Sequence, residues 1–223
     1  MSAGNSAQER AEKILRGGKA TGVLARLRAL VGLQTEPSAA AVAEAARWSA
    51  GAEGERRTAE LVGRLAEEGW FGLFDRHIPG LQSANADIVL IGPDGQVAAI
   101  DAKLWHGRAR VEAADGRLFH GEKDCSGVIR NVRFETDHIQ RGLREALRRR
   151  GAARVPAVVP LIAMHNAPVA DGGFSLDGVR IVPADRLLAV LRQMIGRPDP
   201  EWAALVAAAA GQLLTRYDEG GRR

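Results

Sequence analysis

Two short apolar segments joined by a tight turn constrain the fold of this chain more than any other feature. The segments are Asp87 to Ile91 and Val97 to Leu104, and the turn Pro93-Asp94-Gly95 lies between them. A turn of this composition between two apolar segments is typical of a β-hairpin. The segments are therefore predicted to be antiparallel strands, so that the beginning of the first lies beside the end of the second.

The sequence before and after this hairpin predicts different secondary structure. Up to Glu68, apolar residues recur at helical spacing and predict three helices, at Ala7 to Leu15, Gly22 to Leu33 and Ser38 to Glu68. Between Gly69 and Gly121, short apolar runs alternate with turn residues such as Ala114-Asp115-Gly116. This pattern predicts further strands, at Phe71 to His77, Arg108 to Ala113 and Arg117 to His120.

Helices and strands are again expected after Asp137. The segment HIQRGLREALRRRG predicts an amphipathic helix, with Ile139, Leu143 and Leu147 on one face. The following VPAVVPLIAMH is almost continuously apolar, which is typical of a buried central strand. The last predicted elements are a strand at Val179 to Val182 and helices at Pro183 to Ile195 and Pro200 to Tyr217. The order favours an α/β sandwich.

Length and composition narrow the class of protein. A chain of 223 residues favours one domain with appendages, and we expect an N-terminal helical extension at 1–47, a core domain at 48–195 and a C-terminal helix and tail at 196–223. The one cysteine, Cys125, excludes an internal disulfide and a cysteine-based zinc site. No run of about 18 apolar residues predicts a membrane span, so a cytoplasmic protein is expected.

The charge balance mildly favours a polyanionic partner. The chain has 31 Lys and Arg residues against 27 Asp and Glu residues, a formal charge of +4. Arg141, Arg144 and Arg148 are candidate phosphate contacts on the amphipathic helix, although such a run also suits a solvated helix face. The chain has no phosphate-binding GxxxxGK[ST] loop, GxGxxG fingerprint or HExxH zinc motif, which argues against a nucleotide-driven motor, a dinucleotide oxidoreductase and a zinc protease.

Three charged residues near one end of the predicted hairpin form the strongest candidate site. Strand alternation places Asp101 and Lys103 on one face, and the hairpin brings Asp87 beside them. Charges in an otherwise apolar strand are costly and often mark a site. Carboxylate oxygens bind Mg²⁺ or Mn²⁺, which lowers the pKa of bound water, and a nearby lysine can orient that water or a phosphate. His106 and His120 are further candidates for contact with the metal or a phosphate.

Four short motifs resemble the nuclease-related domain family, NERD, over approximately Trp48 to Leu191. They are G-A-E-G-E ending at Glu55, I-P-G, A-D-I-V-L-I-G-P-D-G and I-D-A-K-L-W-H-G. The resemblance implies a restriction-endonuclease-like α/β/α sandwich with a central mixed sheet and a PD-(D/E)XK site. It implies Asp87 and Asp101 as metal ligands, Lys103 as the catalytic lysine, Glu55 as a further metal-shell carboxylate and Gln140 as a catalytic glutamine. The sequence departs from the family pattern at Ile88, where a polar residue is frequent, and at Asp101, where Glu is frequent.

Together, the residues and the resemblance predict a Mg²⁺- or Mn²⁺-dependent nuclease. DNA is favoured over RNA because the resembling fold most often serves DNA cleavage. The alternative is a non-catalytic nucleic-acid-binding or assembly module that retains the fold. The Ala-rich N-terminal helices also suit close helix packing, so a homodimer or a partner-docking arm is compatible with either function.

Overall fold

The computed structural model describes residues 4–17, 38–81, 84–105 and 107–216. The helix expected at Gly22 to Leu33 lies outside these residues, as do His106 and Tyr217. In the described part of the chain, no helix is both long and apolar enough to cross a membrane.

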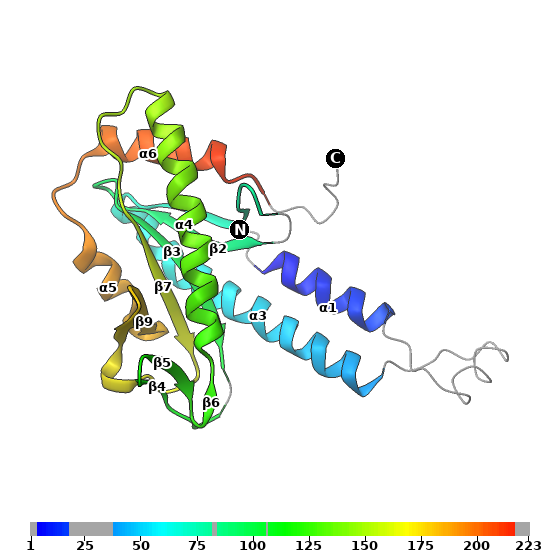
Figure 1. The fold of residues 1–223 in the computed structure, drawn as a ribbon. Coiled ribbons are helices and arrows are strands. Elements are labelled where there is room, and N and C mark those ends of the chain that lie inside the picture. The colour runs from blue at the N-terminus through cyan, green and yellow to red at the C-terminus, as the bar shows by residue number, and fades with distance from the viewer. Residues whose placement is uncertain (1–3, 18–37, 82–83, 106, 217–223) are drawn as a thin grey trace.

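A six-stranded mixed sheet forms the centre of the molecule (Figure 1). The predicted hairpin is its core: β2 and β3 are antiparallel, and β1 pairs antiparallel with the other side of β2. On the far side of β3, β7 and β9 follow in parallel, and β8 closes the sheet antiparallel to β9. The strands in spatial order are β1 (Phe71–His77), β2 (Asn85–Ile91), β3 (Val97–Leu104), β7 (Val158–His165), β9 (Val179–Pro183) and β8 (Phe174–Leu176). The predicted α/β fold with a central mixed sheet is confirmed.

Helices cover both faces of this sheet. Helices α4 (Ser126–Arg149) and α6 (Pro200–Leu213) pack on one face, where Leu143 of α4 meets Val97 in a buried apolar cluster. Helices α3 (Ala39–Gly63) and α5 (Leu187–Met194) pack on the other face, against residues that include Ile100. Alternate residues of β3 therefore face α4 and α3, as the period of two in a strand requires.

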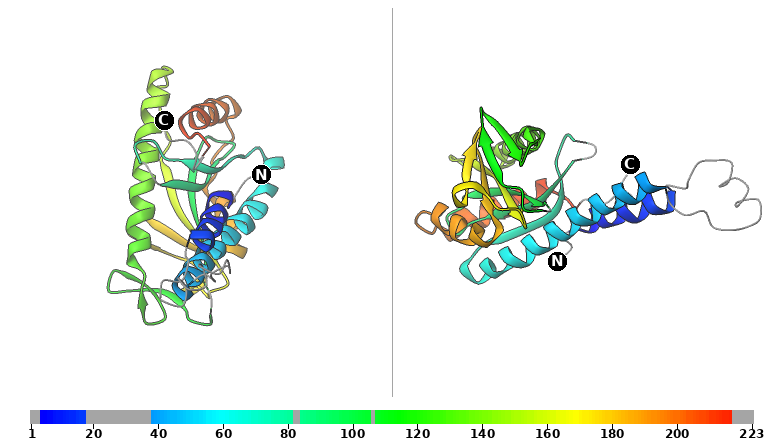
Figure 2. Two further views of the ribbon diagram at one scale, coloured as in Figure 1. Left: turned by 90° about the vertical axis from the view of Figure 1, so that its right-hand side faces the viewer. Right: turned by 90° about the horizontal axis from the view of Figure 1, so that it is seen from below.

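Two smaller units extend from this sandwich. Helix α1 (Asn5–Gly17) packs along the N-terminal half of α3, and the pair forms an arm that projects away from the sheet (Figure 2). A three-stranded antiparallel sheet of β4 (Val111–Ala114), β5 (Arg117–His120) and β6 (Lys123–Asp124) precedes α4. Its predicted turn is confirmed, because Asp115 and Gly116 both have positive φ, as a two-residue hairpin turn requires.

One helix boundary predicted from the sequence was wrong. The helix expected to begin after Asp137 begins at Ser126, so α4 is 24 residues long. Its first half contains β-branched residues and an asparagine, which have weak helix propensity. Packing determines the outcome instead, because Ile129 and Val132 are buried against the small sheet and β7. Smaller differences are the end of α6 at Leu213 and the additional strands β6 and β8.

Candidate active site

The hairpin register brings the two predicted aspartates together. Ile88 of β2 pairs with Ile100 of β3, and Asp87 and Asp101 are the next residues beyond this pair. The Asp87 carboxylate accepts a hydrogen bond of 2.9 Å from the backbone N–H of Ala102. Burial raises the pKa of Asp87 to about 7, and repulsion from Asp101 adds to this effect. The end of the hairpin therefore concentrates negative charge in a poorly solvated position.

Lys103 lies against this pair of carboxylates. Its Nζ donates to Asp101 Oδ1 at 2.7 Å, and the side chains of Lys103 and Asp101 are only 29% and 18% exposed. Burial lowers the pKa of Lys103, but the attraction of Asp101 and Asp87 outweighs that effect and leaves the pKa above its ordinary value. Lys103 is consequently an ammonium at neutral pH, a hydrogen-bond donor rather than a proton acceptor.

Glu55 approaches the same charges from α3. Its side chain is buried, with 7% of its surface exposed. Burial raises the pKa of Glu55 to about 9, and repulsion from Asp87 and Asp75 contributes further. Glu55 Oε2 is buried and has no hydrogen-bond partner among the described residues. A carboxylate in this environment is stabilised either by a proton or by a cation.

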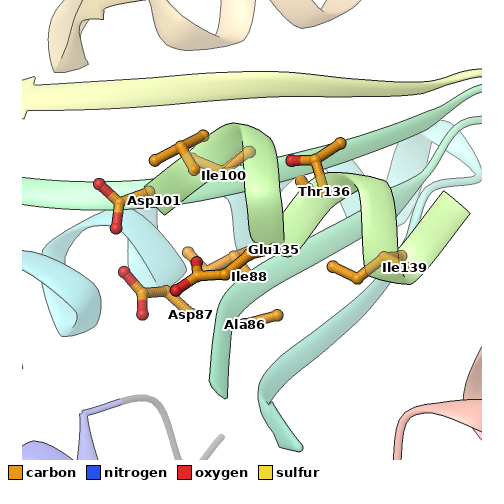
Figure 3. A pocket seen from close by; sticks show the side chains of 10 residues that line it. Ala86, Asp87, Ile88, Ile100, Asp101, Glu135, Thr136 and Ile139 are labelled. Carbon is orange, nitrogen blue, oxygen red and sulfur yellow. The ribbon is translucent and has the colours of Figure 1, made fainter. Parts of the chain in front are cut away.

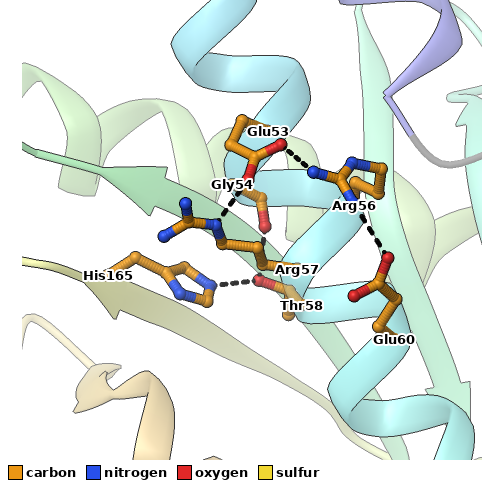
Figure 4. A network of polar contacts seen from close by, with 7 residues as sticks. All are labelled: Glu53, Gly54, Arg56, Arg57, Thr58, Glu60 and His165. Carbon is orange, nitrogen blue, oxygen red and sulfur yellow. Dashed lines mark hydrogen bonds and ion pairs between the residues drawn. The ribbon is translucent and has the colours of Figure 1, made fainter.

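Close packing of α3 on the end of β3 positions Glu55. A Cβ atom at Gly54 would lie 3.2 Å from Leu104 Cβ, so a glycine at this position allows the helix to approach the strand. One turn later, Thr58 Oγ1 donates to the Gly54 carbonyl at 2.8 Å and lies 2.7 Å from Nε2 of His165, at the end of β7 (Figure 4). The contact between Thr58 and His165 fastens α3 to the sheet beside the acidic side chains.

Glu135 is a site residue that the sequence did not predict. It lies on the first half of α4, and Figure 3 shows its carboxylate at the same end of a small pocket as those of Asp87 and Asp101. Burial raises the pKa of Glu135 to about 8, with repulsion from Asp101 and Asp87 next in size. The signal available in the sequence was the helical spacing of Val132, Thr136 and Ile139, which extends the helix back past Glu135.

Asp75 is a second acidic residue that the sequence did not single out. It lies in β1 with a positive φ of 49°, and only 5% of its surface is exposed. Its Oδ1 accepts a hydrogen bond of 3.0 Å from Asn85 Nδ2. Because its charge raises the pKa of both Glu55 and Asp87, Asp75 adds to the negative potential of the site from behind.

One open groove of about 1040 Å³ is lined by Glu55, Asp87, Asp101, Lys103 and Glu135, but not by Asp75. The floor contains the carboxylates and ammonium described above. The walls come from α1, the N-terminal half of α3, the small sheet and the beginning of α4. The acidic cluster is thus accessible to a large ligand.

Comparison with protein families agrees with this geometry. A family model described as nuclease-related domain matches residues 50–164, which is about half of the chain. The chain belongs to the nuclease-related domain family. Searches among curated proteins and among solved structures returned no significant match. The matched nuclease-related domain includes Glu55, Asp87, Asp101, Lys103 and Glu135, whereas α1 and the first part of α3 lie outside it.

The donor set of this nuclease-related domain fits a hard divalent cation. Glu55 Oε2 and Asp101 Oδ2 are both buried and lack hydrogen-bond partners in the part of the chain that the structure describes. Among all the residues that the structure describes, no three His, Cys, Asp or Glu side chains are already arranged to hold a metal ion. Mg²⁺ suits such a site, because it usually keeps several waters and binds through one or two carboxylates together with phosphate oxygens.

Gln140 does not join the cluster of the nuclease-related domain. Its Nε2 donates to the carbonyl of Pro156 at 3.1 Å, and its Oε1 accepts from the N–H of Val158 at 2.7 Å. Val158 pairs with Val97, which is at the opposite end of β3 from Asp101. Both ends of the amide are therefore used to join α4 to the start of β7, away from the predicted catalytic position.

The three predicted phosphate-binding arginines also lie apart from the groove. Arg141, Arg144 and Arg148 are exposed on the second half of α4, and none of them lines the groove. Arg141 Nη2 contacts His138 Nε2 at 3.0 Å. By contrast His120, which the sequence left as a candidate, does line the groove.

Proposed function

We propose that this nuclease-related domain is a metal-dependent nuclease that hydrolyses phosphodiester bonds, with DNA preferred over RNA. The observation that carries the proposal is the convergence of Glu55, Asp87, Asp101 and Glu135 around Lys103 on the floor of an open groove. Buried like charges at this density are costly for a structural role, and they suit a site that binds a cation and a phosphate.

Each side chain has a role that follows from its position. Asp87, Asp101 and Glu55 would hold Mg²⁺ or Mn²⁺, which acidifies bound water and neutralises charge on the phosphate. Lys103, held as an ammonium, donates a hydrogen bond to a phosphate oxygen or to the attacking water. Glu135 faces the aspartates from α4, and its pKa of about 8 suits a group that takes up and returns a proton near neutral pH.

The test pairs metal titration with DNA cleavage. Calorimetric titration of Mn²⁺ and Mg²⁺ into the wild-type protein should give binding that is lost in Asp101→Ala, and cleavage of plasmid and single-stranded DNA should be lost with it. Asp115→Asn is the matched control, because Asp115 is an exposed turn residue outside the groove. Circular dichroism checks that each variant is folded. Unchanged cleavage by Asp101→Ala would contradict the proposal.

A non-catalytic nucleic-acid-binding module is the second candidate. It is favoured by the lack of a three-ligand metal cluster among the described residues. In that case the wild-type protein binds DNA in a filter or anisotropy assay, neither metal produces a calorimetric signal, and plasmid remains intact. Metal binding and cleavage together would exclude this second function.

A further inference from the structure

The groove that contains the acidic floor also has aromatic walls. Trp48, Trp105 and His120 all line it, together with the basic residues Arg10 and Lys123. The aromatic residues come from two separate elements, the projecting arm and the region around the small sheet. None of these aromatic and basic residues belongs to the carboxylates proposed to hold the metal, so their place in the groove needs a separate explanation.

Trp48 provides the wall on the arm. It precedes Glu55 by seven residues on α3, which places both residues on one helix face about 10 Å apart along the axis. The guanidinium of Arg10, from α1, lies 4.8 Å from the centroid of the Trp48 ring. The cation therefore covers one face of the Trp48 ring, and a base would stack on the opposite face. Both residues lie outside the segment that matches the family model.

Trp105 and His120 provide the second wall. Trp105 follows β3 directly, two residues after Lys103, and its ring stacks on His120 with centroids 5.0 Å apart and an interplanar angle of 29°. Lys123 pairs with His120 across the two strands of the small sheet. This wall repeats the composition of the first, with aromatic surface beside a cation that also lines the groove.

Aromatic walls beside a cation suit one form of nucleic acid better than the other. Phosphate contacts at the floor are open to a single strand and to a duplex alike, so they do not distinguish the two forms. Base stacking on aromatic side chains contributes strongly for unpaired strands, whereas in a duplex the faces of the bases are already covered by their neighbours. We propose that the groove binds a single strand of nucleic acid, with bases stacked on Trp48 and on the Trp105–His120 pair. This inference deepens the proposed nuclease function and rests on it.

Fluorescence anisotropy of a labelled oligo-dT strand of about 12 nucleotides tests the inference. Binding is measured with Ca²⁺ in place of Mg²⁺, and the same strand in a duplex is the competitor. Trp48→Leu and Trp105→Leu remove the aromatic face but keep an apolar side chain, whereas Trp48→Phe keeps a ring. Phe71→Leu is the matched control, because Phe71 is 47% exposed on β1 and does not line the groove. Circular dichroism confirms that each variant is folded.

The single strand should bind at least about 10-fold more tightly than the duplex. Each leucine variant should lose about 5- to 100-fold in affinity, the range expected for one lost base–aromatic stack. Trp48→Phe should retain most of the affinity, and Phe71→Leu should match the wild type. Tighter binding of an oligo-U strand with the same tryptophan dependence would support the inference, with RNA as the strand. Equal affinity for duplex, or wild-type affinity of both leucine variants, would overturn it.

The assay separates this inference from the proposed function, because anisotropy does not require cleavage. Loss of cleavage in Asp101→Ala together with full strand affinity in both leucine variants would support the nuclease and overturn the stacking groove. Strand binding that depends on the tryptophans, in a protein that cleaves no nucleic acid, would support the stacking groove and contradict the nuclease. In an active enzyme, Trp48→Leu should raise KM while kcat stays close to the wild-type value.

Discussion

The two ends of strand β3 differ in almost every physical respect. At the Val97 end, side chains are fully buried and apolar, and the nearby amide of Gln140 makes hydrogen bonds through both its nitrogen and its oxygen. At the Asp101 end, four acidic residues face one lysine, and two of their buried oxygens lack partners among the described residues. One strand thus combines an apolar end that stabilises the fold with an end that carries a cluster of acidic side chains.

This difference shows how a small domain can hold a costly site. The apolar end anchors β3 between β2 and β7, with α4 packed above it. Burial of this apolar surface contributes free energy that offsets the repulsion at the other end. Changes at the Val97 end should therefore alter stability, and changes at the Asp101 end should alter chemistry.

The largest effect is expected at Lys103. Lys103→Met should lower kcat for DNA cleavage by roughly two to four orders of magnitude, because it removes the donor that holds the phosphate or the attacking water. Stopped-flow or gel-based cleavage with Mg²⁺ measures this. Lys13→Met, on the exposed surface of α1, is the control. A normal kcat in Lys103→Met would contradict the claim that the Asp101 end of β3 carries the chemistry.

Leu143 tests the stabilising end. The Leu143→Ala substitution removes a side chain that is 1% exposed in the cluster between α4 and the sheet. The cavity should lower the free energy of unfolding by about 2 to 5 kcal/mol, as measured by urea denaturation. Calorimetry with Mn²⁺ at a temperature where the variant is folded should give wild-type affinity. A large loss of metal affinity would show that the two ends are coupled.

A substitution at Gln140 distinguishes a catalytic role, which the family resemblance implies, from a structural role, which its contacts indicate. The Gln140→Ala substitution leaves the Val158 N–H and the Pro156 carbonyl without their partner, and should lower the free energy of unfolding by about 1 to 3 kcal/mol. Cleavage per folded molecule should stay within a few-fold of the wild type. If kcat instead falls by roughly 100-fold with stability unchanged, Gln140 acts in catalysis.

The last prediction concerns the pH dependence of stability, a change in slope and not in activity. The pKa of Glu55 is about 9 in the folded protein and 4.5 ordinarily, so the folded state binds this proton more tightly. The resulting stability is complete below about pH 4.5 and is lost as pH rises towards 9, by up to about 1.4 kcal/mol per pH unit. Glu55→Gln should reduce this slope in metal-free urea denaturation between pH 5 and 8, and the raised pKa values of Asp87 and Glu135 should account for the slope that is left.

The control for this measurement is Glu145→Gln on the exposed face of α4, where the side chain is 72% exposed. Its slope should match the wild type. Saturating Mn²⁺ should reverse the trend in the wild-type protein, because metal binding requires the deprotonated carboxylates that high pH supplies. An unchanged slope in Glu55→Gln would show that Glu55 does not control this dependence.

Local pattern predicted the hairpin and the meeting of Asp87 with Asp101, because a tight turn fixes strand register over the few residues on each side. The family resemblance brought in Glu55. Glu135 was missed because packing, not propensity, sets where α4 begins. The resemblance carried no information on the contacts of Gln140, which lie at the start of β7, so its catalytic role stays a prediction. The arm, the groove walls and the positive φ of Asp75 depend on distant contacts, which a local pattern does not contain.

Helix α3 continues without a break from Ala39 to Gly63, through both Trp48 and Glu55. A continuous helix keeps a constant rise per residue, so the spacing between these two side chains does not change with the loops around them. For a strand held in the groove as proposed, the helix would fix the distance between the base stacked on Trp48 and the carboxylate of Glu55. The number of nucleotides between the stacked base and the cut would then be constant, whatever the identity of those bases.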